Sequence, residues 1–251
     1  AGGFKKGLEE IITEEDCEFI WLLDDDNVPR VDSLDVLKDF WNSLDQKNKQ
    51  NNTSLLSYRP VKDSIGYKKA ILDNNPNLVL GKCNSFLGFH FLDFPKKLFK
   101  FIYTSKNVVK SNIKSGLVSV APYGGLFLHK DLLNTIGYPN ERFFVYADDH
   151  DWTYRIIKNS GKIILILGSI IDDCDISWNV QKRTQSNFSS AINAPKFRLY
   201  FSTRNRIIFE RKDLTRNNFS YLLNILIYSF LFFGYSFLSF RIRNLAVFSQ
   251  A

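Results

Sequence analysis

The sequence predicts an α/β fold in which helices cover a largely parallel sheet. Residues 19–23 and 163–167 are continuous apolar runs, the pattern of strands that are buried on both faces. Residues 31–44 and 149–159 place apolar side chains at helical spacing. Because strand-like and helix-like segments alternate along the chain, the pattern indicates a layered α/β domain.

The other expected elements are shorter. In chain order they are a helix at residues 7–15, a polar loop at 45–54, a strand near 78–80, a strand over 117–128 that Pro122 and Gly124-Gly125 interrupt, and a short helix at 131–136. The Lys- and Phe-rich residues 94–103 match none of these patterns, and they are left unassigned.

The distribution of charge divides the chain into a body and a tail. The 251 residues are 45% hydrophobic, which suits one domain with an appendage and excludes intrinsic disorder. Residues 1–181 carry 22 Lys and Arg against 24 Asp and Glu, whereas residues 182–251 carry 11 against two. The charge boundary, near residues 177–181, therefore divides an acidic body from a basic tail. Three scattered cysteines exclude a disulfide scaffold and suit a reducing compartment.

The tail contains an apolar segment at residues 219–240. As a helix its 22 residues would be about 33 Å long, against a bilayer core of about 30 Å. Serines and Asn224 interrupt the segment, so a membrane span, a helix in the membrane plane and a buried core helix all remain open. Basic residues before the segment outnumber Arg241 and Arg243 after it, which predicts attachment to the cytoplasmic face of the plasma membrane. A membrane surface is thus the expected partner of the tail, and nucleic acid is not.

The first group of candidate site residues is Asp24-Asp25-Asp26, directly after the apolar run at 19–23. Ligands of open α/β sheets bind beyond the carboxyl ends of the strands. Three adjacent carboxylates repel one another unless a cation offsets their charge, and Asp24 and Asp26 can both turn towards one divalent ion. The alternative is a solvated turn that caps the following segment.

The second group is Asp148-Asp149, which ends another apolar stretch and begins the helix at 149–159. One aspartate there would simply cap the helix. With two, the more deeply placed carboxylate could serve as a general base that takes a proton from an incoming hydroxyl. Asp151 and Arg155, four residues apart, are expected to pair on the helix surface.

Three weaker signals complete the candidates. Tyr123-Gly124-Gly125 indicates a bend or a close approach of backbone to a ligand. The cluster of Arg198, Arg204 and Arg206 could bind a diphosphate or lipid headgroups. A third acidic cluster follows the run at 163–167, where one residue could complete a metal site or all could form a surface turn: Asp172, Asp173 and Asp175.

Taken together and in this order, these motifs resemble the family 2 glycosyltransferases, which have the GT-A fold. The resemblance covers roughly residues 1–210, which it implies are the glycosyltransferase domain, and it leaves residues 211–251 as a basic, membrane-associating helical tail. It rests on AGGF at 1–4, WLLDDDN at 21–27, GGLFLHKDLLNTIGYPNERFFVYADDHDWTYRIIKNSG at 124–161 and RLYFSTRNRIIF at 198–209. Within the family, the chain looks closest to bacterial galactofuranosyl- and rhamnosyltransferase-like enzymes of cell-surface polysaccharide synthesis.

The resemblance implies an inverting transfer from a nucleotide-diphosphate sugar to a hydroxyl of a glycan or lipid-linked glycan, with Mn²⁺ or Mg²⁺ as the cofactor. Asp149, with Asp148 beside it, would match the catalytic base. The remaining implied roles are donor diphosphate binding by Asp24, Asp25 and Arg204, metal binding by Asp24, Asp26 and Asp173, and acceptor binding by Tyr123, Gly124, Gly125 and Trp152.

Two departures from the family pattern shape the remaining expectations. Close relatives often place a metal-binding histidine after the strand at 163–167, where this chain has only aspartates. The family's first strand–helix units, which hold the nucleotide, would precede Ala1, so we expect the chain to be a fragment that alone binds nucleotide poorly. The alternatives are another metal-dependent phosphoryl or nucleotidyl transferase and a non-catalytic glycan-binding GT-A domain.

Overall fold

The computed structural model describes residues 1–93, 113–174, 194–238 and 245–251, apart from residues 46, 48, 62, 64 and 65. The chain divides into two compact units. Unit 1 comprises Ala1–Leu80, Asn112–Phe144 and Asp148–Arg183, and unit 2 comprises Gly81–Ser111, Val145–Ala147 and Thr184–Ala251. Residues 184–210, expected in the catalytic domain, therefore belong to the same unit as the tail.

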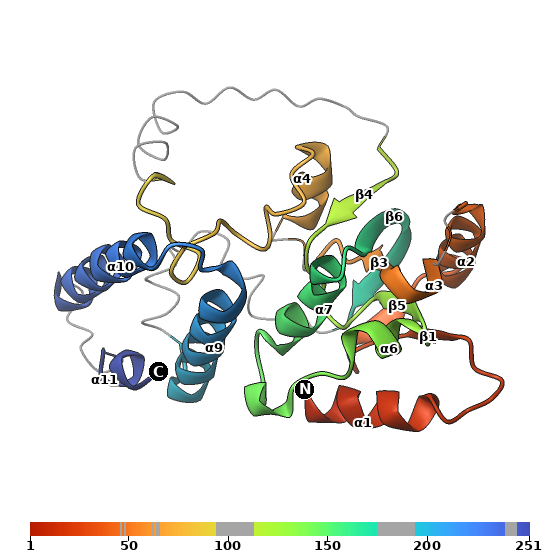
Figure 1. Cartoon of the computed structure of the whole chain (residues 1–251), viewed down its shortest axis with the longest axis horizontal. Coiled ribbons are helices and arrows are strands. Elements are labelled where there is room, and N and C mark those ends of the chain that lie inside the picture. Colours follow the sequence, from red (N-terminus) through yellow and green to blue (C-terminus); the bar gives the residue numbers. More distant parts are fainter. Residues whose placement is uncertain are drawn as a thin grey trace. The chain divides into compact units, whose positions relative to one another are not determined.

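Unit 1 is built on one mixed sheet (Figure 1). Its strands are, in spatial order, β1 (Phe19–Trp21), β5 (Leu126–His129), β3 (Thr53–Tyr58), β6 (Lys162–Asp173) and β2 (Asn27–Pro29), and β4 (Ser115–Val118) also pairs with β6. The pairing of β3 with β6 is parallel, and the other four pairings are antiparallel.

The expected α/β class is confirmed, but the expected mostly parallel sheet is not, because the sheet is mostly antiparallel. All four residues of β5 are buried, and β5 is antiparallel to both of its neighbours, β1 and β3. An internal antiparallel strand that is covered on both faces has the same apolar run as a parallel one, so the run did not fix the direction. Since β3 is parallel to β6, the strands β1, β3 and β6 still run the same way, and their carboxyl ends lie at one edge.

Helices cover both faces of this sheet. On one face, α1 (Gly2–Ile11), α4 (Tyr67–Leu72), α6 (Leu132–Ile136) and α7 (Asp148–Lys158) share a core with alternate strand residues such as Leu56 and Leu128. On the other face, Leu37 and Trp41 of α2 (Ser33–Ser43) pack on Leu55 and Phe127. Neighbouring strand residues thus point to opposite cores, as the pleat requires.

Most predicted helices of unit 1 are confirmed within two residues at their ends, but the first begins earlier than expected, at Gly2. The prediction of a strand near residues 78–80 is wrong, because these residues form a turn. The polar loop at 45–54 contains the short helix α3 (Lys49–Asn52) and runs into β3, which was missed. A 3-10 helix, η2 (Glu141–Phe143), precedes the Asp148-Asp149 pair. Residues 94–103 and Asp175 lie outside the described residues.

The regular elements described in unit 2 are helices. It contains α9 (Lys196–Phe209), the π-helical η4 (Glu210–Leu214), α10 (Asn218–Leu238) and α11 (Leu245–Gln250), around a core that includes Phe86, Phe232 and Phe248. Of the described helices, α10 is the one that is long and apolar enough to cross a membrane, with a mean hydropathy of 1.7. Length and composition alone do not separate a span from a core helix.

Candidate functional site

The candidate site forms where β1, β3 and β6 end. Asp24 follows β1 by three residues, Arg59 comes directly after β3, and Asp173 is the last residue of β6. Asp26 and Asn27 lie where β2 begins, and Asn27 faces Asp173 in the β2–β6 pairing. The common direction of the three strands therefore gathers side chains from distant parts of the sequence.

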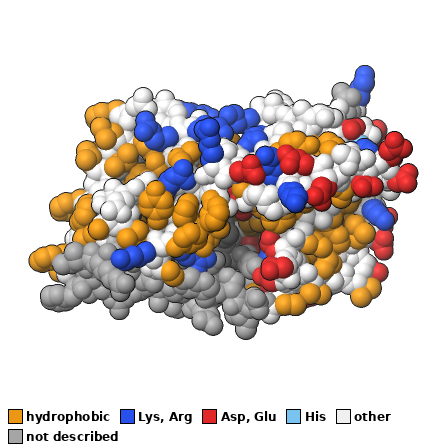
Figure 2. Space-filling model, turned by 90° about the horizontal axis from the view of Figure 1, so that it is seen from below, with side chains coloured by type: hydrophobic (Ala, Val, Ile, Leu, Met, Phe, Trp, Pro, Cys, Tyr) orange, Lys and Arg blue, Asp and Glu red, His pale blue; other side chains and the backbone are white. Residues whose placement is uncertain are grey.

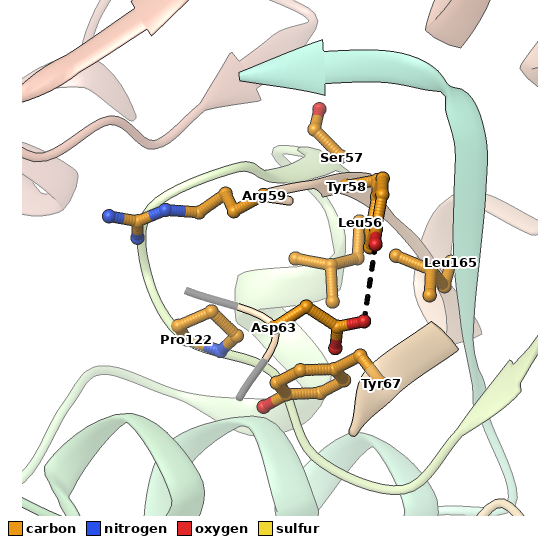
Figure 3. A pocket seen from close by; sticks show the side chains of 8 residues that line it. All are labelled: Leu56, Ser57, Tyr58, Arg59, Asp63, Tyr67, Pro122 and Leu165. Carbon is orange, nitrogen blue, oxygen red and sulfur yellow. Dashed lines mark hydrogen bonds between the residues drawn. The ribbon is translucent and has the colours of Figure 1, made fainter. Parts of the chain in front are cut away.

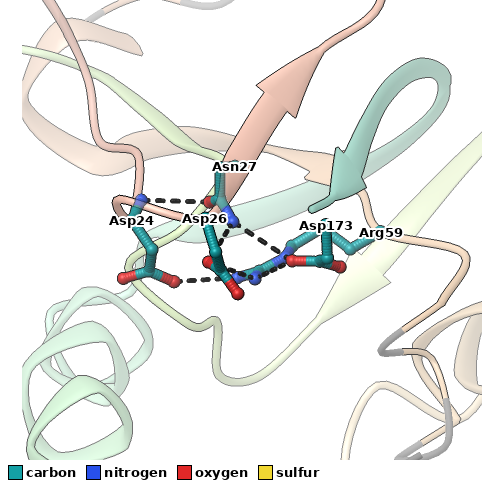
Figure 4. A network of polar contacts seen from close by, with 5 residues as sticks. All are labelled: Asp24, Asp26, Asn27, Arg59 and Asp173. Atoms are coloured by element: carbon teal, nitrogen blue, oxygen red, sulfur yellow. Dashed lines mark hydrogen bonds and ion pairs between the residues drawn. The ribbon is translucent and has the colours of Figure 1, made fainter. Parts of the chain in front are cut away.

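Arg59 is at the centre of this group (Figure 4). Its Nη1 donates to Asp24 Oδ2 at 3.1 Å, its Nε donates to Asp173 Oδ1 at 3.1 Å, and its Nη2 pairs with Asp173 and lies 3.7 Å from Asp26 Oδ1. Burial, which leaves Arg59 8% exposed, would lower the pKa of its guanidinium, but hydrogen bonds and the charges of Asp173 and Asp24 raise it overall. The side chain is thus a permanent cation among three carboxylates.

Asn27 and Gly124 complete this arrangement. The Asn27 amide donates to Asp26 Oδ1 at 2.9 Å and to Asp173 Oδ1 at 3.1 Å, and its Oδ1 accepts from the backbone N–H of Asp24 at 3.0 Å. A Cβ atom at position 124 would lie within 3.0 Å of atoms of Arg59, Asn27 and Asp24. A side chain at position 124 would therefore have to push the ends of these three side chains aside, and glycine leaves the network undisturbed.

The Asp148-Asp149 pair begins α7 in the same unit. Burial, with the neighbouring charge of Asp148, raises the pKa of Asp149 to about 7, and the charge of Asp24 adds to this shift. The backbone N–H of His150 donates to Asp149 Oδ1 at 2.8 Å and opposes the shift. Asp149 therefore exchanges its proton near neutral pH, which is the property of an effective general base.

The backbone before this pair is strained. Phe144, Tyr146 and Ala147 all have positive φ values, of 57°, 68° and 58°. Residues with side chains rarely adopt this region, and such residues cluster at functional sites because the surrounding structure must hold them there. In unit 2, the buried Asn205 amide donates to the carbonyl oxygens of Val145 and Tyr146 at 2.7 and 3.1 Å and so holds two of these peptides.

Two buried tyrosines face the aspartate pair. Burial and the charges of Asp148 and Asp149 raise the pKa of Tyr123, whose ring stacks on Phe4 at 4.2 Å. Burial and the charge of Asp149 likewise raise the pKa of Tyr67. The Tyr67 hydroxyl has no hydrogen-bond partner among the described residues, which is a costly state for a buried donor.

Two hollows lie beside these residues. A cavity of about 90 Å³ is lined by Tyr67, Arg59, Asp63 and mainly apolar neighbours (Figure 3), and the Tyr58 hydroxyl donates across it to Asp63 at 3.2 Å. An open groove of about 510 Å³ follows α1 and β1 and ends at Leu23, next to Asp24. The groove has the size of a small-molecule site, whereas the cavity does not.

The other predicted site residues have different surroundings. Asp25 is exposed, and Trp152 is fully buried, with its indole N–H donating to the Gly137 carbonyl at 2.7 Å. Trp152 therefore anchors α7 in the core, and the centroid of its ring lies 5.7 Å from that of Tyr123. Gly125, with a φ of 99°, packs against Ser57 and Ile171.

The basic cluster of unit 2 is held by contacts within that unit. Arg204 donates to the Asn205 side chain at 2.8 Å, Arg206 pairs with the buried Glu210 at 2.7 Å, and the Arg198 guanidinium lies 5.3 Å from the Tyr146 ring. The expected role of Arg204 at the donor diphosphate stays a prediction. The Asp151–Arg155 pair forms as expected, at 2.7 Å, but the Asp151 carboxylate is fully buried.

Sequence reasoning missed Arg59, Asn27 and Tyr67. The only sequence signal for Arg59 is the short Leu55-Leu56 pair before it, which is too brief to mark a buried strand by itself. Asn27 was a visible neighbour of the acidic triplet, and its amide could have been considered as a partner for the carboxylates.

The carboxylates expected to hold a metal ion fit it in donor type but already pair with Arg59. Three carboxylates and the Asn27 amide are oxygen-rich groups, which suit Mg²⁺ or Mn²⁺. Arg59 already contacts all three carboxylates, and in the part of the chain that is described no group of three acidic, His or Cys side chains is arranged to hold an ion. The donor type therefore fits, and a cation would have to displace Arg59.

Comparison with known proteins finds no family model that matches this chain and no curated protein that matches it.

Proposed function

We propose that this chain is a glycosyltransferase of the GT-A type, which transfers a sugar from a nucleotide-diphosphate sugar to a hydroxyl of a glycan or lipid-linked glycan. The observation that carries the proposal is the raised pKa of Asp149, to about 7, in the unit that also contains the Arg59 cluster. A titratable base beside a strongly charged group is the combination that such a transfer needs.

Asp149 has the role of the general base in this proposal. Its ionised carboxylate takes the proton of the acceptor hydroxyl, and the hydroxyl oxygen forms a bond to the anomeric carbon of the donor sugar. The bond from that carbon to the diphosphate breaks, and its electron pair leaves with the diphosphate. Because Asp149 must be ionised to accept the proton, the transfer rate should rise as the pH passes through about 7.

In this proposal the Arg59 cluster neutralises the negative charge of the diphosphate. Asp24, Asp26 and Asp173 would hold Mg²⁺ or Mn²⁺, which when bound offsets the negative charge of the leaving diphosphate. Arg59 pairs with these carboxylates in the absence of an ion, and its displaced guanidinium could then donate to phosphate oxygens. The groove along α1 and β1 includes Leu23, the residue before Asp24, and its size suits part of a sugar nucleotide.

The variant Asp149→Asn tests the base assignment. We expect it to lose at least about a hundredfold in transfer rate while donor binding is retained, because the amide cannot take a proton. Its matched control is Asp39→Asn, the same change at an exposed position of α2. The measurement is nucleoside diphosphate release from UDP-galactofuranose, dTDP-rhamnose, UDP-glucose and UDP-galactose, with Mn²⁺ and alkyl glycoside acceptors. Unchanged transfer by Asp149→Asn would remove the base from the proposal.

The same assay separates the other classes of protein. Release of pyrophosphate, or transfer of a phosphoryl group, would identify a nucleotidyl or phosphoryl transferase that uses the same carboxylates. Binding of a sugar nucleotide or glycan without turnover at any pH would identify a non-catalytic binding domain.

A further inference from the structure

Helix α10 has two different faces. One face packs into the core of unit 2 through Tyr221, Asn224, Tyr228, Phe232 and Ser236. The opposite face carries six apolar side chains at spacings of three or four residues, each between 45% and 78% exposed: Phe219, Leu222, Leu226, Phe230, Phe233 and Phe237. A continuous apolar stripe of this length on a soluble surface marks an interaction site.

Buried polar bonds attach the other face of α10 to unit 2. The Asn224 amide donates to the Asn84 carbonyl at 2.8 Å, and its Oδ1 accepts from the backbone N–H of Phe91 at 2.7 Å. Asn84 Oδ1 in turn accepts from the backbone N–H groups of Arg216 and Asn217, just before the helix. A helix that left unit 2 to cross a bilayer would lose these bonds and carry Asn224 into hydrocarbon, which is costly.

Unit 2 is strongly basic. Its residues include 15 Lys and Arg against three Asp and Glu, a net charge of +12. Of the acidic residues, Glu210 is buried, the Asp213 side chain is only 2% exposed, and Asp93 pairs with Lys82. Figure 2 shows apolar and basic side chains together over the surface formed by α9 to α11. A surface of this composition is complementary to a layer that is apolar inside and anionic outside.

We propose that α10 docks on an anionic membrane in the plane of the surface, with its exposed stripe inserted among the lipids and without crossing the bilayer. The polar bonds of Asn224 keep the helix on unit 2, while Arg211, Lys212 and Arg216, all exposed and just before α10, contact the headgroups. This mode is that of an interfacial amphipathic helix. The inference does not depend on the proposed transferase activity, since it concerns another unit and another property.

Flotation of the full chain with vesicles tests the docking. We expect binding to phosphatidylcholine vesicles that contain phosphatidylglycerol, and at least about tenfold weaker binding to phosphatidylcholine alone. The double variant Leu226→Ser/Phe230→Ser should weaken binding by at least about tenfold, because two inserted apolar side chains are lost. The matched control is Val31→Ser, which removes a side chain that is 90% exposed on unit 1 and should leave binding unchanged.

Sided labelling distinguishes docking in the plane from a span. In a background with the native cysteines replaced by serine, Asn218→Cys and Ser249→Cys should both react with a membrane-impermeant maleimide added outside the vesicles. Protection of either position would show a span and overturn the proposal. Absence of binding to both kinds of vesicle would also overturn it. So would self-association without vesicles that Leu226→Ser/Phe230→Ser abolishes, because the stripe would then bind a second copy.

Discussion

Two groups of aspartates in unit 1 have different electrostatic surroundings. Asp24, Asp26 and Asp173 surround the buried guanidinium of Arg59, and the Asp173 side chain is itself completely buried. Asp148 and Asp149 are adjacent to each other at the start of α7, and burial raises the pKa of Asp149 to about 7. Both groups follow from acidic pairs or triplets in the sequence, and both have a cation nearby. The Arg59 guanidinium contacts all three carboxylates of the first group. In the second group the Ala1 amino group pairs with Asp148 Oδ2 at 2.8 Å, and burial dominates the pKa of Asp149.

This difference suggests a division of labour within one unit. Carboxylates that surround a guanidinium are suited to hold a cation or to position a charged group. A carboxyl group with a pKa near 7 is poorly suited to hold a fixed charge but exchanges its proton readily. The charge of Asp24 contributes to the raised pKa of Asp149, so removing that charge should lower the pKa of Asp149.

The largest expected effect comes from removing the cation. The variant Arg59→Met should lower the free energy of unfolding at pH 7 by about 3–5 kcal/mol, because three carboxylates would remain close together without the guanidinium that offsets their charge. Denaturant unfolding measures this change. Arg59→Lys keeps the charge and serves as the control, with a smaller loss because lysine cannot make the forked contacts. Equal stability of Arg59→Met and the unchanged chain would mean that solvent alone screens the cluster.

Addition of Mn²⁺ tests whether a divalent ion and Arg59 bind the same carboxylates. If Arg59 and a divalent ion compete for the cluster, Mn²⁺ should raise the unfolding temperature of Arg59→Met more than that of the unchanged chain. At an ion concentration a hundred times the dissociation constant, the gain is about 2.7 kcal/mol. Loss of the Mn²⁺ effect in Arg59→Met would instead show that Arg59 helps to build the ion site.

The acidic members of the site were predictable from the sequence, whereas their cation was not. Asp24 and Asp173 follow apolar runs long enough to mark buried strands, and the rule that ligands bind at strand ends then places them together. Arg59 follows β3, whose Leu55-Leu56 is flanked by Ser54 and Ser57. Two apolar residues between serines do not distinguish a central strand from a loop.

Helices were predicted better than the sheet for a related reason. In α2, the helical spacing of apolar residues such as Leu37 and Trp41 shows directly which face of the helix is buried. The direction of a strand depends on which segment lies beside it, and β5 pairs with residues 70 to 74 positions earlier in the chain, in β3. Short apolar runs carry no information on such distant pairing.

A smaller effect on stability should follow from replacing Asp149, the carboxyl group with the raised pKa. Because the folded-state pKa of Asp149 lies above its unfolded value, the folded chain retains the proton as the pH rises from about 4 to about 7, and the stability contribution of this group is lost over that interval. Asp149→Asn should therefore be more stable than the unchanged chain at pH 8, by on the order of 2 kcal/mol, since the half-buried side chain is partly screened. At pH 5, about a third of the way through that interval, the gain should be correspondingly smaller.

Thermal unfolding at both pH values, with Asp39→Asn as the exposed control, measures this difference. A stability gain of Asp149→Asn that is the same at pH 5 and pH 8 would contradict the raised pKa. This test is independent of catalysis, because a chain that transfers no sugar would still show the pH dependence if the carboxyl is held as the structure indicates.

The smallest expected effect lies one residue from Asp173. Asp172 pairs with Arg30 at 2.6 and 2.8 Å, and this contact lowers the pKa of Asp172, but both side chains are exposed. Water screens such a pair, so Asp172→Asn should shift the unfolding temperature by about 1 °C or less, and less still in high salt. Its small contribution should vanish as the pH falls through the lowered pKa. A shift as large as that of Arg59→Met would mean that burial does not separate these neighbouring aspartates, and the contrast between the two acidic groups would then have another cause.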